Sequence, residues 1–168
     1  MMSLILKKNN SMDQPTKQQW DEFKKALSDR YGCQYLQCDG YAVCINIEMS
    51  NKRALHYVVY VNGWLDGKWI KAVKEDEIDS LPEESKRFYM PHKKGRPAKE
   101  IKIYEKIYGK RECKKMGIYK KQVLAMPYWK SINSLISHFK KHNQQISIVS
   151  QEDYKLMIKK TDLTASTE

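Results

Sequence analysis

The sequence predicts an α+β fold: an N-terminal helix, a three-stranded antiparallel meander, and then a basic, mainly helical half with one short C-terminal strand. Three observations support this prediction. Apolar residues recur at helical spacing over residues 16–32 and again over residues 127–142. Residues 41–48 alternate between apolar and polar side chains, as in a half-buried strand. Hydrophobic residues make up 41% and charged residues 30% of the chain, with only 7 Gly and 5 Pro, which indicates a globular protein.

The first helix is expected to begin directly after Thr16. The tetrapeptide Thr16–Gln19 has the form of a capping box, in which the Thr hydroxyl and the Gln side chain satisfy backbone amides of the first turn. The apolar side chains that follow at helical spacing should pack in the core, and Gly32 should end the helix. These side chains are Trp20, Phe23, Leu27 and Tyr31.

The meander is expected over residues 41–73. Its first strand is the alternating segment 41–48, and its second strand is residues 54–61, which are apolar on both faces. Trp64 and Trp69-Ile70 would continue the sheet on the far side of a turn. The three strands would then pair in sequence order.

Two dipeptides after the second strand are hairpin signals. Asn62-Gly63 and Asp66-Gly67 can each supply the positive φ angles that a tight turn requires. They lie too close together to serve two separate hairpins. One is therefore expected to be the turn, and the other a bulge or the end of a strand.

Residues 75–99 are expected to be a long, mobile connection. Their apolar periodicity is weak, and they contain three prolines and a glycine. The segment opens with an acidic run, residues 75–84, which holds six acids, and the basic region begins two residues later. We hypothesise that the acidic run folds over the basic region and screens it when no partner is bound.

Helical periodicity returns after this connection. Ile103, Tyr104, Ile107 and Tyr108 would form the apolar face of the first helix, Lys99, Lys102, Lys106 and Lys110 the other face, and Gly109 its end. The elements expected in this half are helices at 99–109 and 110–122, a candidate strand within 123–126, a helix at 128–142, a strand at 146–149 and a helix at 151–160.

The length of 168 residues suits one domain with a well-developed core. We expect a flexible leader at residues 1–14, a single α+β domain at 15–160 and a loose tail at 161–168. The leader has no signal-peptide features, and the apolar runs are far shorter than a bilayer span. A cytoplasmic protein without a membrane partner is therefore expected.

Four cysteines without a secretory signal indicate reduced thiols: Cys33, Cys38, Cys44 and Cys113. A zinc site is the alternative, because Cys33 and Cys38 could join His138 and His142, which one helical face would present together. The spacing is looser than that of a zinc knuckle. Buried thiols and surface histidines are the favoured interpretation, and no cofactor is expected.

Positive charge is concentrated in one third of the chain. Residues 86–142 hold 17 Lys and Arg against 3 acids, whereas the other 111 residues hold 14 Lys and Arg against 17 acids. Clustered cations add their potentials within a Debye length, so this segregation predicts steering toward a polyanion. The alternative is a solvated lysine-rich face with no partner.

Catalytic motifs are lacking in the sequence. There is no phosphate-cradling glycine loop, no nucleophile elbow and no metal-hydrolase spacing of Asp, Glu and His. A metal-dependent nuclease is the third hypothesis, with Glu48, Asp66, Glu84 and Lys86 as its candidate set, but any chain with 20 acids offers such a set. We therefore expect a non-enzymatic protein.

The stretch MPHKKGRPAK, residues 90–99, holds a more specific signal. Its Gly95-Arg96-Pro97 tripeptide resembles the core of AT-hook peptides and the basic arms that precede helix-turn-helix units in some DNA invertases, although Lys94 stands where the AT-hook has arginine. The resemblance implies that Arg96 lies along the narrow minor groove of A·T-rich DNA. The alternative is a lysine-flanked loop without a partner.

The chain as a whole resembles the small basic accessory proteins of phages and mobile elements, through its Tyr-Val-Asn-Gly-Trp hairpin (60–64) and its Pro-Tyr-Trp-Lys-Ser helix entry (127–131). This resemblance implies a second hypothesis: a protein-directed inhibitor of host defence machinery, anti-CRISPR-like, whose basic patch docks on an acidic protein surface. Such a protein would have little affinity for free nucleic acid.

The leading hypothesis is a binding module that engages nucleic acid or a nucleoprotein complex through residues 86–142. Phosphate contacts from lysines and arginines would supply affinity without sequence choice. The residues expected to bind nucleic acid are Lys93, Lys94, Arg96, Lys99, Lys102, Lys106, Lys110, Arg111, Lys114, Lys115, Lys120 and Lys121.

Overall fold

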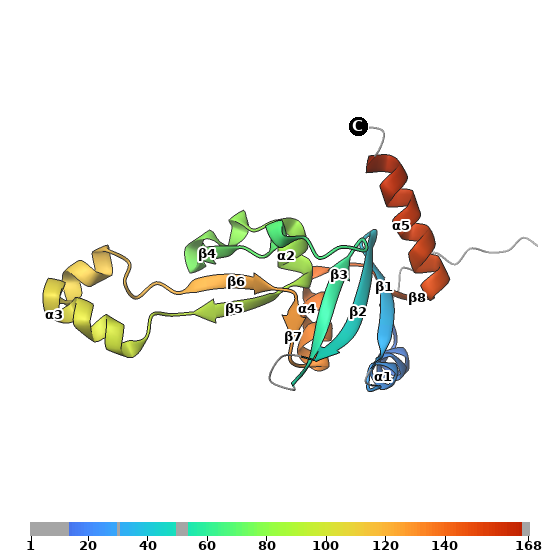
Figure 1. The fold of residues 1–168 in the computed structure, drawn as a ribbon, viewed down its shortest axis with the longest axis horizontal. Coiled ribbons are helices and arrows are strands. Elements are labelled where there is room, and N and C mark those ends of the chain that lie inside the picture. Colours follow the sequence, from blue (N-terminus) through green and yellow to red (C-terminus); the bar gives the residue numbers. More distant parts are fainter. Residues whose placement is uncertain (1–13, 30, 50–53, 166–168) are drawn as a thin grey trace, which may run out of the picture.

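The computed structural model describes residues 14–29, 31–49 and 54–165, and it confirms the α+β class (Figure 1). The described strands form a five-stranded sheet and a three-stranded sheet, and every strand pair is antiparallel. None of the described helices is long and apolar enough to cross a membrane. The expected leader lies outside the described residues except for Gln14.

The five-stranded sheet has the order β7-β3-β2-β1-β8 and forms the centre of the body. Its strands are β1 (Cys33–Cys38), β2 (Tyr41–Met49), β3 (Leu55–Val61), β7 (Tyr128–Trp129) and β8 (Ile146–Val149). The two strands expected at 41–48 and 54–61 are thus confirmed as β2 and β3. Strands β7 and β8, which come late in the chain, form the two edges of this sheet, and the earlier strands β1, β2 and β3 form its centre.

The meander differs from the expected one because it begins earlier. It consists of β1, β2 and β3, and β1 is a strand that the sequence analysis does not predict. Trp64 makes only an isolated bridge to Val61. Residues 67–69 form a 3₁₀ helix, η1 (Gly67–Trp69), and β4 (Ala72–Lys74) joins the other sheet. The chain therefore leaves the five-stranded sheet directly after the Asn62-Gly63 turn.

The two candidate turn signals have different roles. Asn62 and Gly63 have φ angles of 50° and 81°, and Val61 and Trp64 exchange backbone hydrogen bonds of 3.0 Å across them, so this pair is the turn. Asp66 instead caps η1, because its side chain accepts a hydrogen bond of 2.8 Å from the Lys68 amide. The second signal marks the start of a helix.

Helices cover both faces of the central sheet. The main core lies beneath one face, where α1 (Lys17–Ala26), α2 (Glu83–Phe88) and α4 (Ile132–His142) contribute buried side chains. A smaller cluster on the other face joins the sheet to α5 (Gln151–Ala165). Residues 161–165, expected in a loose tail, therefore belong to a helix, and 166–168 lie outside the described residues.

The capping box of α1 is confirmed. The Thr16 hydroxyl accepts a hydrogen bond from the Gln19 amide, and the Gln19 side chain accepts one of 2.8 Å from the Thr16 amide. Trp20, Phe23 and Leu27 of the apolar stripe are buried as predicted, but Tyr31 is 90% exposed. The reason is that the helix ends at Ala26, so Tyr31 no longer lies on its stripe.

The segment 75–99 is not the irregular connection that was expected. It contains the 3₁₀ helix η2 (Glu75–Ser80), helix α2, strand β5 (Met90–Lys94) and the start of α3. These elements are short and depend on tertiary contacts, which is why the sequence shows little periodicity. Phe88 and Tyr89 are fully buried, and the Ser85 hydroxyl donates a hydrogen bond of 2.7 Å to the Trp69 carbonyl.

A long projection leaves the body between α2 and β7 (Figure 1). Strands β5 and β6 (Gln122–Met126) form its stem, β4 pairs with residues 122–124 at the end of β6 nearer α3, and α3 (Ala98–Lys115) lies at its far end. We call residues 90–126 the basic arm. The candidate strand within 123–126 is confirmed as β6, whereas β5 and β7 were not expected. The helix expected at 128–142 begins only at Ile132, because residues 128–129 form β7 at the edge of the central sheet.

Gly109 divides α3 into two helical pieces, as its sequence position predicted. Its φ of 76° and ψ of 154° are not helical, and a residue with a side chain is strained at this φ. The piece after Gly109 ends at Lys115 instead of residue 122, because the chain must return to β6.

Pro127 then leads from β6 into β7, and its carbonyl accepts a 3.1 Å hydrogen bond from the Val59 amide of β3.

Candidate nucleic-acid interface

The fold gathers every cation of the predicted site on the basic arm. Residues 90–126 hold 12 Lys and Arg against 3 acids, and these twelve cations are the twelve residues named from the sequence. All twelve are exposed. Strand β5 carries Lys93 and Lys94, whereas the other ten follow on the loop after β5, on α3 and on the return toward β6.

Helix α3 presents lysines and isoleucines side by side. Lys99, Lys102 and Lys106 are spaced three and four residues apart, so they form one stripe along the helix. Ile103 and Ile107 border this stripe and are 59% and 64% exposed. These two residues of the expected apolar face are not covered by the body, because the arm carries α3 away from it (Figure 1).

A cationic cavity of about 660 Å³ lies at the elbow between the stem and α3. The loop after β5 forms one wall and residues 115–122 form another. Its lining contains a single acid, Glu100. The cations that line it are Lys74, Lys94, Arg96, Lys115, Lys120 and Lys121. A cavity with this charge is suited to anionic groups such as phosphates.

Gly95-Arg96-Pro97 forms the loop into α3 and contributes to this cavity. Arg96 donates a hydrogen bond of 2.6 Å to Glu100, and its guanidinium lies 5.3 Å from the centre of the Tyr104 ring. The segment is a short connection between a strand and a helix. It is therefore not a free extended arm of the kind that the AT-hook resemblance implies.

The acidic run lies against the basic arm at two points. Lys93 pairs with Glu75 and Lys120 pairs with Asp76, each at 2.6 Å. Hydrogen bonds from these lysines hold the pKa of both carboxyl groups below their usual values. All four side chains are more than 40% exposed, so a competing polyanion could replace the carboxylates.

The aromatic residues near the arm divide into exposed and buried groups. Tyr108, Tyr119 and Tyr128 are 50%, 41% and 38% exposed, whereas Trp129 is buried. Tyr104 is half-buried and stacks on Tyr108, with ring centres 6.2 Å apart. Exposed tyrosine rings are surfaces on which unpaired bases can stack.

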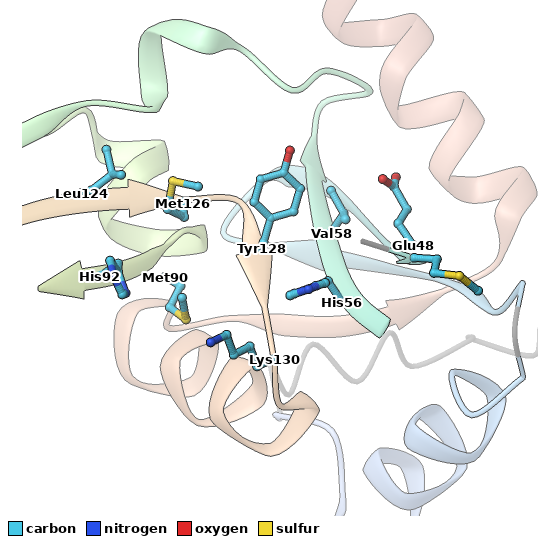
Figure 2. Close-up of a pocket in the computed structure, with 10 residues that line it drawn as sticks. Glu48, His56, Val58, Met90, His92, Leu124, Met126, Tyr128 and Lys130 are labelled. Carbon is cyan, nitrogen blue, oxygen red and sulfur yellow. The ribbon is translucent and has the colours of Figure 1, made fainter. Parts of the chain in front are cut away.

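A second cavity, of about 480 Å³, lies where the arm joins the body (Figure 2). Figure 2 shows side chains of the stem on one side and of the central sheet on the other, with Tyr128 between them. The His56 Nδ1 atom is buried here and has no hydrogen-bond partner among the described residues. The lining residues are Glu48, Met49, His56, Val58, Met90, His92, Leu124, Met126, Tyr128 and Lys130.

Sequence reasoning missed this second cavity. Its residues come from five segments, β2, β3, β5, β6 and the chain around β7, and no local motif joins them. The cavity is mainly apolar, but a glutamate, two histidines, a tyrosine and a lysine line it. It can accept an apolar group that also offers hydrogen-bonding edges.

The zinc alternative does not assemble. Cys38 packs in the main core and Cys33 packs on the opposite face of the sheet with the α5 cluster, because five positions along a strand reverse the face. His138 and His142 do lie together on α4, with ring centres 4.2 Å apart. Within the described ranges, no group of three or more Cys, His, Asp or Glu residues could hold a metal ion. The nuclease set of Glu48, Asp66 and Glu84 therefore does not converge either.

Comparison with known proteins gives no assignment. No protein-family model, no curated protein and no solved structure matches this chain.

Proposed function

We propose that this protein is a non-enzymatic binding module whose basic arm engages nucleic acid or a nucleoprotein complex. One observation carries the proposal: twelve exposed cations, with only three acids among them, are gathered on one projection of the molecule (Figure 1). A solvated lysine-rich face without a partner would not require that the cations share a single projecting element.

The arm is only partly neutralised by the protein itself. Four of its cations form ion pairs: Lys93, Arg96, Lys115 and Lys120. Among the described residues, the other eight have no carboxylate within ion-pair distance: Lys94, Lys99, Lys102, Lys106, Lys110, Arg111, Lys114 and Lys121. Neighbouring cations within a Debye length, roughly 8 Å at physiological salt, sum to a field that attracts a polyanion.

The shape of the arm also supports the proposal. The major groove of DNA admits either a helix or a two-stranded β-ribbon, and the arm offers both. Lys99 and Lys106 lie about 10 Å apart along α3, since each residue rises about 1.5 Å. Measured along the axis of a DNA duplex, this distance covers roughly three base-pair steps. The cationic cavity at the elbow adds a place where phosphates can be surrounded.

The experiment is a titration of fluorescent duplex DNA and single-stranded RNA with the full chain at several salt concentrations. The test variant replaces four unpaired arm cations, Lys94, Lys102, Lys106 and Lys121, with Gln. We expect its affinity near 0.15 M salt to fall at least about tenfold, and the slope of log K against log salt to fall by about 1 for each lost phosphate contact.

A matched control distinguishes the loss of a binding site on the arm from the loss of net positive charge. It replaces four exposed lysines of the body, Lys17, Lys25, Lys155 and Lys159, with Gln and removes the same charge. We expect this control to bind nearly as the unchanged protein does. Equal losses in both variants would contradict an arm-centred site and indicate non-specific attraction alone.

The exposed isoleucines favour a second candidate, the protein-directed inhibitor of host defence machinery. Ile103 and Ile107 offer an apolar contact beside the lysine stripe, and such a mixed surface suits an acidic protein partner with an apolar patch. This candidate predicts that neither duplex DNA nor RNA binds the full chain at about 0.15 M salt. That result would replace the first candidate with the second.

A further inference from the structure

Two cysteines face each other on adjacent strands, far along the chain from the basic arm. Cys33 begins β1, and Cys44 lies on β2. The strand register pairs Cys33 with Asn46 and Tyr35 with Cys44, so the two cysteines occupy diagonal positions on the same face of the sheet. Their Sγ atoms are 3.2 Å apart.

This separation is close to what a disulfide needs. The sulfur atoms of a disulfide are about 2.05 Å apart, so they would have to approach by only about 1 Å. The other two cysteines are placed differently. Cys38 and Cys113 are both fully buried, the first in the main core and the second on the arm.

The pair combines an accessible sulfur with a protected one. Cys33 is half-buried, whereas Cys44 is buried and packs with Ala42 and Tyr154. The hydrogen bond between the two sulfurs lowers the pKa of Cys33 to about 6, burial opposes this shift, and a hydrogen bond from Tyr35 assists it. The Cys44 thiol also lies 3.2 Å from Asn46 Oδ1, a second acceptor for its proton. The hydrogen bond between the two sulfurs raises the pKa of Cys44. At neutral pH the accessible sulfur is therefore the nucleophilic thiolate.

We propose that Cys33 and Cys44 form a reversible dithiol–disulfide pair that exchanges with low-molecular-weight disulfides. The Cys33 thiolate attacks one sulfur of the disulfide, a Cys33 mixed disulfide forms, and the first thiolate leaves. The Cys44 thiol then loses its proton and attacks the Cys33 sulfur, which forms the Cys33–Cys44 bond and releases the second thiolate. In total, the protein loses two protons and two electrons, and one small disulfide becomes two thiols.

The test treats the folded full chain with oxidised glutathione at neutral pH. After remaining thiols are alkylated, peptide mass spectrometry locates the modified cysteines. We expect a peptide pair joined through Cys33 and Cys44 that has lost two hydrogen atoms and is restored by dithiothreitol, with Cys38 and Cys113 alkylated only after unfolding. Glutathione that stays on Cys33 of the unchanged protein, with no joined peptides, would overturn the proposal.

Two variants separate the roles of the cysteines. In Cys44→Ser, which keeps a hydrogen-bond donor of similar size, the mixed disulfide on Cys33 should accumulate because no resolving thiol remains. In Cys33→Ser, Cys44 should stay unmodified.

A rate measurement provides an independent check. Iodoacetamide should alkylate Cys33 of the folded chain roughly two- to threefold faster than it alkylates free cysteine at neutral pH, because the larger thiolate fraction outweighs the lower nucleophilicity of a thiolate of low pKa. Cys44→Ala, which lacks the donor, should lose most of this acceleration. A rate at Cys33 that equals that of free cysteine would count against the pair.

Discussion

At the scale of single residues, Asp39 joins three distant parts of the body. Its carboxylate accepts hydrogen bonds from the Gln144 and Gln145 amides, and Arg87 of α2 pairs with it. Burial opposes ionisation of Asp39, but these hydrogen bonds outweigh it and hold the pKa of the carboxyl below its usual value. The turn between β1 and β2 is thereby fixed to α2 and to the segment before β8.

His138 supplies a prediction about pH. Its Nε2–H donates a hydrogen bond of 2.9 Å to the Lys86 carbonyl, and its ring packs against Trp129. Burial, followed by the neighbouring His142, lowers the pKa of His138 from 6.5 to about 4. Within this window the unfolded chain binds a proton that the folded chain does not. The free energy of unfolding should therefore fall as the pH falls from 6.5 toward 4.

The measurement is urea unfolding of the protein and of His138→Gln across this pH window. Gln keeps a donor for the Lys86 carbonyl but does not titrate. Between neutral pH and about pH 4, the free energy of unfolding of the unchanged protein should fall further than that of the variant. The difference should stay below about 3 kcal/mol, because the ring is partly accessible to solvent. Parallel pH profiles for the two proteins would contradict the assignment.

At the scale of elements, the contact between η2 and the arm is the clearest regulatory feature. The sequence raised the hypothesis that the acidic run screens the basic region, and the pairs from Glu75 to Lys93 and from Asp76 to Lys120 place the two in contact.

The double variant Glu75→Gln, Asp76→Asn tests this screening. It frees two lysines and removes two negative charges beside the arm, so affinity for duplex DNA should rise roughly fivefold at moderate salt. Asp21→Asn, Glu22→Gln is the matched control, because it removes the same charge from α1. An equal rise in the control would attribute the effect to net charge instead of local screening.

At the scale of the whole molecule, the body and the distal arm are separable. The main core takes Val123 and Ala125 from the stem but no residue from 95–121. Lys94 and Gln122 are register partners at the end of the stem, so a two-residue Asn-Gly turn can join them.

The corresponding variant replaces residues 95–121 with Asn-Gly. It removes ten of the twelve arm cations and leaves the main core intact. We expect circular dichroism to show a folded body with a similar melting temperature, and the titration to show that nucleic-acid binding is lost. A folded variant that still bound duplex DNA with the original affinity would place the site on the body.

Part of this architecture could be predicted from sequence because the signals are local. The Thr16 capping box, the strands β2 and β3, and the break at Gly109 each depend on residues a few positions apart, and all are present in the structure. The Asp39-Gly40 turn between β1 and β2 is an equally local signal. Both residues have positive φ, and an Asp-Gly dipeptide before the strand at 41–48 is typical of a hairpin whose first strand is β1.

The sequence by itself determined which residues carry the charge: the twelve cations and their segregation from the acids are properties of the chain alone. The tertiary structure decided where that charge is presented. Strand β5 pairs with β6 across some thirty intervening residues, and only this long-range pairing turns the basic segment into an arm, exposes Ile103 and Ile107, and encloses both cavities. Such contacts depend on chain closure between distant segments, which local periodicity does not encode.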